Sequence, residues 1–215
     1  MKINYIGFTK ELDKQFLVGP HLVTECLIRY RFIKAHSAKA EIEVPYRVLP
    51  IKPTKNYLDS KRARVDLYYG NPEDAVFEFK YHRRTKYSDN CTATKMGSVF
   101  RDLNRLSIID KNEKYFIYVF DDNMKNYYEN IKQKIDIFKI SKVKIGNTYT
   151  INTATDTVIT LQSIREEAFS GFNPTIVTGF KDFYYTIEVK YVKTFQIVGM
   201  EDLTKNLYLI ILQVK

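Results

Sequence analysis

Three charged residues in the first half of the chain have the types and the spacing of a hydrolytic site. Asp66 lies in the segment RVDLYY (64–69), and Glu78 and Lys80 lie two residues apart in AVFEFKY (75–81). Both segments are rich in the aromatic and β-branched residues that favour strands, and the intervening GNPED contains turn residues. Because residues two apart in a strand share a face, Glu78 and Lys80 point the same way.

A hairpin with a five-residue loop would place the two carboxylates side by side. In that register Tyr69 faces Ala75, and antiparallel pairing sets Asp66 opposite Glu78. Side chains directly opposite lie about 5 Å apart at Cβ, and two carboxylates at this spacing repel unless a cation lies between them. A shift of one residue would turn Asp66 to the other face of the sheet. The predicted site therefore depends on the register of one hairpin.

A divalent cation, Mg²⁺ or Mn²⁺, suits such a pair because it takes hard oxygen ligands and only a few of them from the protein. The metal would lower the pKa of a bound water and stabilise charge on a phosphate. Lys80 would hold or deprotonate the attacking water, or offset phosphoryl charge. This chemistry is phosphodiester hydrolysis. The alternative is that Asp66 and Glu78 only pair with Arg64 and Lys80 across an exposed sheet.

The surrounding sequence predicts the elements that would position these residues. Periodicity indicates a helix from Pro20 to about Ala35, a strand within 41–50, the hairpin, an amphipathic helix from about Thr92 to Ile109, a buried strand over 114–120 and a helix ending near Phe138. From Ile140 onward short strand-like segments follow, including ISKVKI, TYTIN, YYTIEVKYV and LYLIILQV. They would extend the first sheet or form a second subdomain.

We therefore expect an α/β fold with a mixed central β-sheet flanked by helices over 1–138, and a β-rich C-terminal part over 139–215. The order of elements, with Asp66 and the Glu78-x-Lys80 pair in adjacent strands, resembles the PD-(D/E)XK nuclease superfamily, whose fold is restriction-endonuclease-like. The resemblance covers roughly residues 20–138. It implies that Asp66 and Glu78 bind Mg²⁺ and that Lys80 is the catalytic lysine.

Two positions bear on this resemblance. The residue before the aspartate is Val65, where the superfamily pattern has proline. Many members also carry an acidic residue on the first helix, and Glu25 matches it as a third metal ligand. The alternative for Glu25 is a surface ion pair with Arg29, one helical turn further along.

Basic residues near the motif are candidates for contacts with a nucleic-acid backbone. HRRTK directly follows the proposed catalytic strand, and two arginines lie one turn apart on the following helix. Solvated surface charge is the simpler interpretation of each. The candidates are His82, Arg83, Arg84, Lys86, Arg101 and Arg105.

Composition agrees with a folded protein that meets a polyanion. Of 215 residues, 45% are hydrophobic, and the net charge is +9, which favours binding to nucleic acid. Cys26 and Cys91 form no metal-binding pattern, and we expect both as free thiols. The first residues lack the apolar stretch of a signal peptide, and the run LYLIIL is too short to span a bilayer, so we expect a soluble cytoplasmic protein.

The expected function is that of a Mg²⁺-dependent endonuclease acting on DNA, of restriction, repair or phage type, as a monomer or a homodimer. No P-loop, GxSxG, HExxH or GxGxxG pattern occurs, which disfavours nucleotide-driven, serine-hydrolase, zincin and dinucleotide chemistry. The second hypothesis is a basic nucleic-acid-binding or assembly protein on the same fold, without catalysis. A third is an RNA-cleaving toxin.

Overall fold

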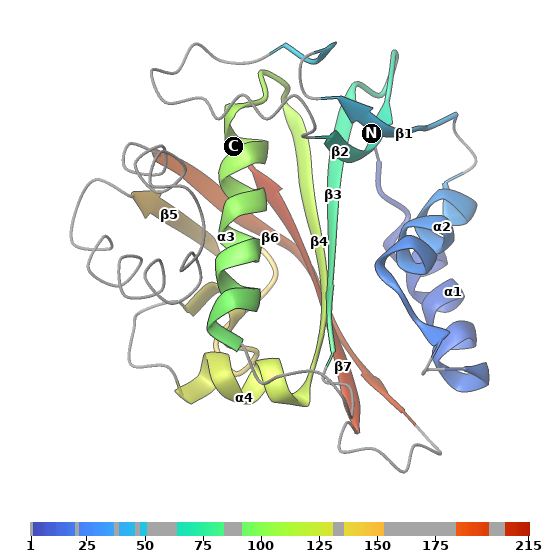
Figure 1. The fold of residues 1–215 in the computed structure, drawn as a ribbon, viewed down its shortest axis with the longest axis vertical. Coiled ribbons are helices and arrows are strands. Elements are labelled where there is room, and N and C mark those ends of the chain that lie inside the picture. The colour runs from blue at the N-terminus through green and yellow to red at the C-terminus, as the bar shows by residue number, and fades with distance from the viewer. Residues whose placement is uncertain are drawn as a thin grey trace.

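The fold is described from a computed structural model over residues 2–19, 22–36, 39–45, 48–50, 64–83, 92–130, 136–152, 184–197 and 205–215. Within these ranges the protein is α/β, with four α-helices and a seven-stranded mixed sheet (Figure 1). The elements in chain order are α1 (Tyr5–Val18), α2 (Glu25–Ala35), β1 (Glu41–Pro45), β2 (Arg64–Tyr69), β3 (Ala75–His82), α3 (Thr92–Ile108), β4 (Glu113–Asp121), α4 (Asp122–Asn130), η3 (Asp136–Phe138), β5 (Thr148–Asn152), β6 (Tyr184–Gln196) and β7 (Asn206–Val214).

The sheet has the strand order β1-β2-β3-β4-β7-β6-β5. Strands β1, β2 and β3 are antiparallel neighbours, whereas β4 runs parallel to β3 after the crossover through α3. Strand β7 pairs antiparallel with β4, and β6 and β5 follow it in antiparallel pairing. The C-terminal strands therefore extend the first sheet, which confirms one of the two alternatives for this part of the chain.

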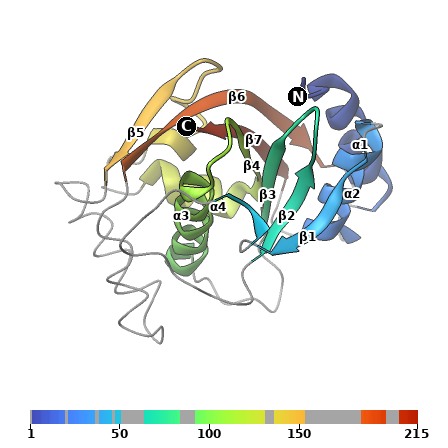
Figure 2. The same cartoon turned by 90° about the horizontal axis from the view of Figure 1, so that it is seen from above.

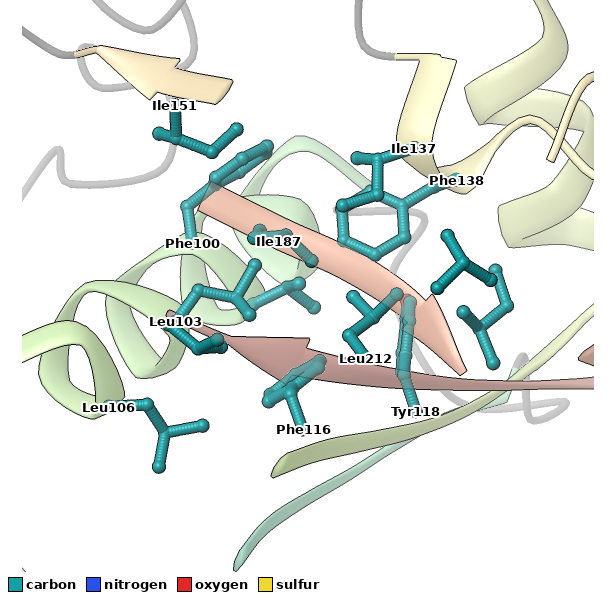
Figure 3. Close-up of a cluster of buried hydrophobic side chains, with 14 of the residues drawn as sticks. Phe100, Leu103, Leu106, Phe116, Tyr118, Ile137, Phe138, Ile151, Ile187 and Leu212 are labelled. Carbon is teal, nitrogen blue, oxygen red and sulfur yellow. The ribbon is translucent and has the colours of Figure 1, made fainter. Parts of the chain in front are cut away.

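Helices cover both faces of the sheet, which curves around α3 (Figure 2). Helices α1 and α2 pack on one face through Phe8 and Phe32, against Phe77 and Phe79 of β3. The opposite face carries α3, α4 and η3, and its core is drawn in Figure 3. This confirms the predicted α/β class with a mixed sheet between helices. None of the described helices has the length and apolar character needed to cross a membrane.

Several predicted elements agree closely with the structure. The hairpin strands, the helix from Thr92 and the apolar strand at 114–120 appear within one or two residues of their predicted ends. Helix α2 begins later than predicted, at Glu25, because the Thr24 side chain caps it by accepting a hydrogen bond from Leu27 N at 3.2 Å.

Other predictions fail or lie outside the described residues. Helix α1 was not predicted, although its buried residues Phe8, Leu12 and Phe16 recur every fourth position. The segment ISKVKI forms turns and not the predicted strand. For the helix predicted to end near Phe138, the structure describes α4 over Asp122–Asn130, and residues 131–135 lie outside the described part of the chain. Phe138 itself lies in the short 3₁₀ helix η3 (Asp136–Phe138).

Helix α3 is held at its C-terminal end by a buried lysine. The Lys114 side chain is 1% exposed, and its Nζ donates to the carbonyl oxygens of Ser107 and Ile109 at 3.2 and 3.1 Å. The last carbonyls of a helix have no partner within the helix, and a cation at this end also suits the helix dipole. Lys114 thus fixes α3 relative to β4.

Replacing Lys114 by methionine keeps the apolar stem and removes the donor, so two buried carbonyl groups lose a partner. We expect Lys114→Met to lower the free energy of unfolding by about 2–4 kcal/mol in urea denaturation. The matched control is Lys111→Met, which breaks the more exposed 2.6 Å pair with Asp74 and should cost less than about 1 kcal/mol. Equal losses for the two variants would contradict the role of Lys114.

Candidate active site

The hairpin between β2 and β3 has the predicted register. Tyr69 pairs with Ala75, and Leu67 pairs with Phe77. The same register would set Asp66 opposite Glu78, but the ladder between the two strands ends at the Leu67–Phe77 pair. From this point β2 diverges from β3 and leaves one edge of β3 without a strand partner.

The divergence coincides with a backbone irregularity in β1. Glu43 has φ of +56°, a conformation that side-chain-bearing residues rarely adopt, and it lies between the Ile42–Leu67 and Val44–Val65 pairs. Val65 is buried under α3, whereas Leu67 is buried under α2. A regular strand over Arg64–Tyr69 is expected to put Val65 and Leu67 on one face. That expectation is wrong, because the strand changes face at Asp66.

Two carboxylates occupy the edge of β3 where β2 has left it. Asp66 Oδ2 accepts a hydrogen bond from Phe79 N at 2.7 Å, and Glu25 Oε2 accepts one from Tyr81 N at 3.2 Å. These amides are two residues apart and therefore point to the same side of the strand. Side-chain oxygens thus replace the strand carbonyls that would otherwise accept from them.

Asp66 also joins the second predicted metal ligand. The Glu78 side chain, 6% exposed, is hydrogen-bonded to Asp66, so the two carboxyl groups lie together. Burial raises the pKa of Asp66 above its usual range, although the Phe79 amide, Glu78 and the Arg29 guanidinium each lower it. Two adjacent carboxyl groups repel when both are ionised, so a cation beside this pair would be favourable.

Arg29 of α2 is a cation in direct contact with this carboxyl pair. Its Nη1 lies 2.9 Å from Asp66 Oδ1 and 2.5 Å from Glu43 Oε1. The Glu25–Arg29 pairing considered from the sequence is replaced by these contacts, because Glu25 turns to Tyr81 N and to Lys80. Helix α2 therefore contributes one carboxylate and one guanidinium to the site.

Lys80 lies between side chains from two helices. Its Nζ is 2.9 Å from Asp102 Oδ2 of α3 and 3.7 Å from Glu25 Oε2 of α2. Burial lowers the pKa of Lys80, but Asp102, Glu25 and Glu78 together outweigh burial and raise it above its usual range. Lys80 is therefore an ammonium at neutral pH, which suits holding a water or offsetting negative charge and disfavours proton abstraction.

The donor set fits a hard divalent cation held by few protein ligands. Over the parts of the chain that the structure describes, no three His, Cys, Asp or Glu side chains form a group that could hold a metal ion. The Asp66–Glu78 pair supplies two carboxylates, which is the number that Mg²⁺ commonly takes from a protein before waters and phosphate oxygens complete its shell. Glu25, whose pKa is raised by burial despite Lys80, stays a predicted third ligand, although the structure does not group it with this pair.

The predicted nucleic-acid contacts have different surroundings. Arg101 and Arg105 lie on α3 on either side of Asp102, at 3.4 and 3.5 Å from its Oδ1. The Arg83 side chain lies beside the Tyr81 hydroxyl. Arg84 and Lys86 fall outside the described residues.

The His82 side chain packs between the sheet and α3, where it contacts Tyr118 of β4 and Ser98 of α3. Its Nδ1 is 2.9 Å from the Tyr118 hydroxyl and its Nε2 is 3.3 Å from Ser98 Oγ. Burial, with smaller contributions from Lys80 and Lys95, lowers the pKa of His82 to about 3. The ring is therefore neutral at neutral pH and offers no positive charge to a phosphate.

Asp102 and Arg29 are site residues that the sequence reasoning missed. Asp102 is the one acidic residue of α3, and it lies three and four residues from the buried Val99 and Leu106. A carboxylate on the buried side of a helix needs a cationic partner. The position of Asp102 among apolar residues could therefore have predicted an ion pair at this place. Arg29 offered no comparable signal, because its contacts depend on the bend at Glu43.

The chain matches no known protein family, no curated protein and no solved structure. The function is therefore argued from the chemistry of the site.

The low pKa of His82 predicts a specific dependence of stability on pH. The unfolded chain binds a proton at the ordinary pKa of 6.5, whereas the folded protein binds it only near 3. Stability must therefore fall as the pH falls through this window, by about 2 kcal/mol between pH 8 and pH 5 from this residue alone. We expect His82→Gln to lose correspondingly less stability over that range in urea denaturation.

The internal control is the range above pH 7, where both proteins carry a neutral side chain and their stability curves should run parallel. Parallel curves all the way down to pH 5 would contradict the buried, neutral state of His82.

Proposed function

We propose that the protein is a Mg²⁺-dependent nuclease that hydrolyses phosphodiester bonds in DNA. The observation that carries the proposal is the meeting of the hydrogen-bonded Asp66 and Glu78 carboxyl groups with the Lys80 side chain at the edge of β3. Paired carboxylates next to a fixed ammonium are suited to a reaction in which a metal and a cation act on one phosphate.

In this proposal Asp66 and Glu78 hold the metal ion, and Glu25 is the third ligand that the superfamily resemblance implies. A bound Mg²⁺ supplies a water of lowered pKa and stabilises charge on the phosphate. The carboxylates are already oriented by protein contacts, because Phe79 N and Arg29 fix Asp66. Such support of ligands by neighbouring hydrogen bonds is typical of metal sites.

Lys80 acts as a charged hydrogen-bond donor. Its ammonium, stabilised by Asp102 and Glu25, would orient the attacking water or stabilise the negative charge that develops on the phosphate oxygens. General-base catalysis by Lys80 is disfavoured, because its pKa is raised and little neutral amine is present at neutral pH.

The arrangement of elements supports the resemblance to the PD-(D/E)XK superfamily and its restriction-endonuclease-like fold. A helix precedes three antiparallel strands, and a second helix leads to a strand parallel to the third. Asp66 lies on the second strand of this set, and Glu78 and Lys80 lie on the third. The order is the one on which the resemblance was based.

DNA is the proposed substrate because the chain carries a net positive charge and two arginines lie beside the candidate site. The net charge is +9, and Arg101 and Arg105 are half-buried on α3 beside Lys80's partner Asp102. Arginines at this place would contact phosphates next to the one that is cleaved.

The direct test is cleavage of plasmid DNA by purified protein with Mg²⁺ or Mn²⁺. We expect nicking or cutting that EDTA abolishes, and rates at least about 100-fold lower for Asp66→Ala and Lys80→Ala, because each removes a group that stabilises the transition state. Asp74→Asn, at the opposite end of the hairpin, is the matched control and should cut at the wild-type rate.

Two outcomes would overturn the proposal. One is that wild type cuts neither DNA nor RNA, and the other is that both alanine variants cut as fast as wild type. Salt-sensitive DNA binding without cleavage, unchanged by Asp66→Ala and by EDTA, would assign the non-catalytic binding protein instead. Cleavage confined to RNA would assign the ribonuclease.

Metal binding can be tested without substrate. A ligand that binds only the folded state stabilises it by RT ln(1 + [L]/Kd), so 10 mM Mn²⁺ at a Kd near 1 mM raises the melting temperature by about 3 °C. We expect this rise in wild type and in Asp74→Asn, and its loss in Asp66→Asn and in Glu78→Gln. A rise of the same size in all four proteins would place the metal elsewhere.

A further inference from the structure

The strongest ion pair of Lys80 is formed with a residue outside the predicted motif. The Lys80 Nζ to Asp102 Oδ2 distance of 2.9 Å is that of a charge-assisted hydrogen bond, whereas Glu25 at 3.7 Å lies beyond hydrogen-bond length. A lysine side chain has a long flexible stem and no preferred direction of its own. Asp102 is therefore the group that sets the direction of the ammonium.

Asp102 is itself held in place. It is 4% exposed, and it projects from the middle of α3, whose apolar face is buried against the sheet. The Lys114 contacts fix the end of the same helix. A carboxylate on such a rigid element can hold its partner within the small tolerance that catalysis requires.

The neighbouring arginines leave Lys80 as the main partner. Arg101 and Arg105 approach the other carboxylate oxygen, Oδ1, at 3.4 and 3.5 Å, and both side chains are more exposed than Asp102. Oδ2 makes the short contact to Lys80. Asp102 Oδ2 therefore contacts the candidate site through Lys80, whereas Oδ1 contacts the two arginines on the more exposed side of α3.

We infer that Asp102 is a positioning residue for the nuclease reaction, which directs the Lys80 ammonium toward a phosphate next to the metal ion that the Asp66–Glu78 pair would hold. The inference rests on the proposed function and deepens it. Asp102 touches neither substrate nor metal in this scheme. Its effect on the chemical step passes through Lys80, and this distinguishes it from a carboxylate that only stabilises the fold. An effect through Arg101 and Arg105 on substrate binding would appear in KM.

The experiment is a double-mutant cycle on cleavage of a labelled DNA duplex, with kcat and KM measured at saturating Mg²⁺. We expect Asp102→Asn to lower kcat about 10- to 100-fold and to change KM less than about 3-fold. Asp102→Glu should recover most of the rate, because it restores the charge. In the Lys80→Met background, Asp102→Asn should change the residual single-turnover rate less than 2-fold.

Asp74→Asn is the matched control, because it removes another carboxylate from a lysine, at 2.6 Å from Lys111, and should leave kcat unchanged. Melting temperatures measured on every variant show whether a lost rate reflects lost folding. If the cleavage rate of Lys80→Met is too low to measure, two other results test the positioning role of Asp102. These are the recovery of kcat in Asp102→Glu and a KM for Asp102→Asn that changes less than about 3-fold.

Three results would overturn the inference and are distinguishable from one another. Wild-type kcat in a folded Asp102→Asn would remove the positioning role and leave the nuclease intact. Equal rate losses in the presence and absence of Lys80 would make Asp102 a structural residue. No cleavage by wild type would overturn the proposed function and the inference with it.

Discussion

The site exists because backbone amides on the edge of a strand must be hydrogen-bonded. Where β2 diverges from β3, Phe79 N and Tyr81 N lose the strand carbonyls that would have accepted from them. An unsatisfied buried amide costs about 1–3 kcal/mol, so the fold needs acceptors at this place. Asp66 and Glu25 supply them, and two carboxylates are brought to one edge by the requirement of the sheet itself. Asp66 and Glu25, which are proposed to bind the metal, are thus also the acceptors for the free backbone amides at the edge of β3.

This double role explains the charge balance of the site. Burial raises the pKa of both Asp66 and Glu25, so ionising them costs free energy in the folded protein. Arg29 and Lys80 offset part of that cost through contacts of 2.9 and 3.7 Å. A divalent cation would offset more of it, because it acts on both members of the Asp66–Glu78 pair at once. A site whose carboxylates are incompletely compensated by the protein is one that gains from binding a metal.

The sequence was informative where local rules decide the structure. The GNPED loop fixed the pairing of Tyr69 with Ala75, and the alternation in β3 separated Glu78 and Lys80 from the aromatic side chains. Predictions from the sequence failed where contacts between distant parts of the chain determine the structure. The left-handed conformation of Glu43 and the change of face at Asp66 follow no local pattern. Helix α1 was a readable element, since Phe8, Leu12 and Phe16 recur every fourth position. The role of Asp102 as an ion-pair partner could have been predicted, since a single acidic residue on the buried face of a helix needs a cationic partner.

The divergence of the strands also explains how side chains from opposite faces of the sheet meet. Helix α2 packs on one face and α3 on the other, and a complete sheet would keep Glu25 and Asp102 apart. Without β2 alongside, the edge of β3 is open, and the Lys80 ammonium contacts a carboxylate from each layer. The position of the Lys80 ammonium therefore depends on the packing of both α2 and α3 against the sheet. A change in the packing of either helix would move the Lys80 ammonium. Residues away from the proposed metal ligands, such as Asp102, are therefore expected to affect the proposed reaction.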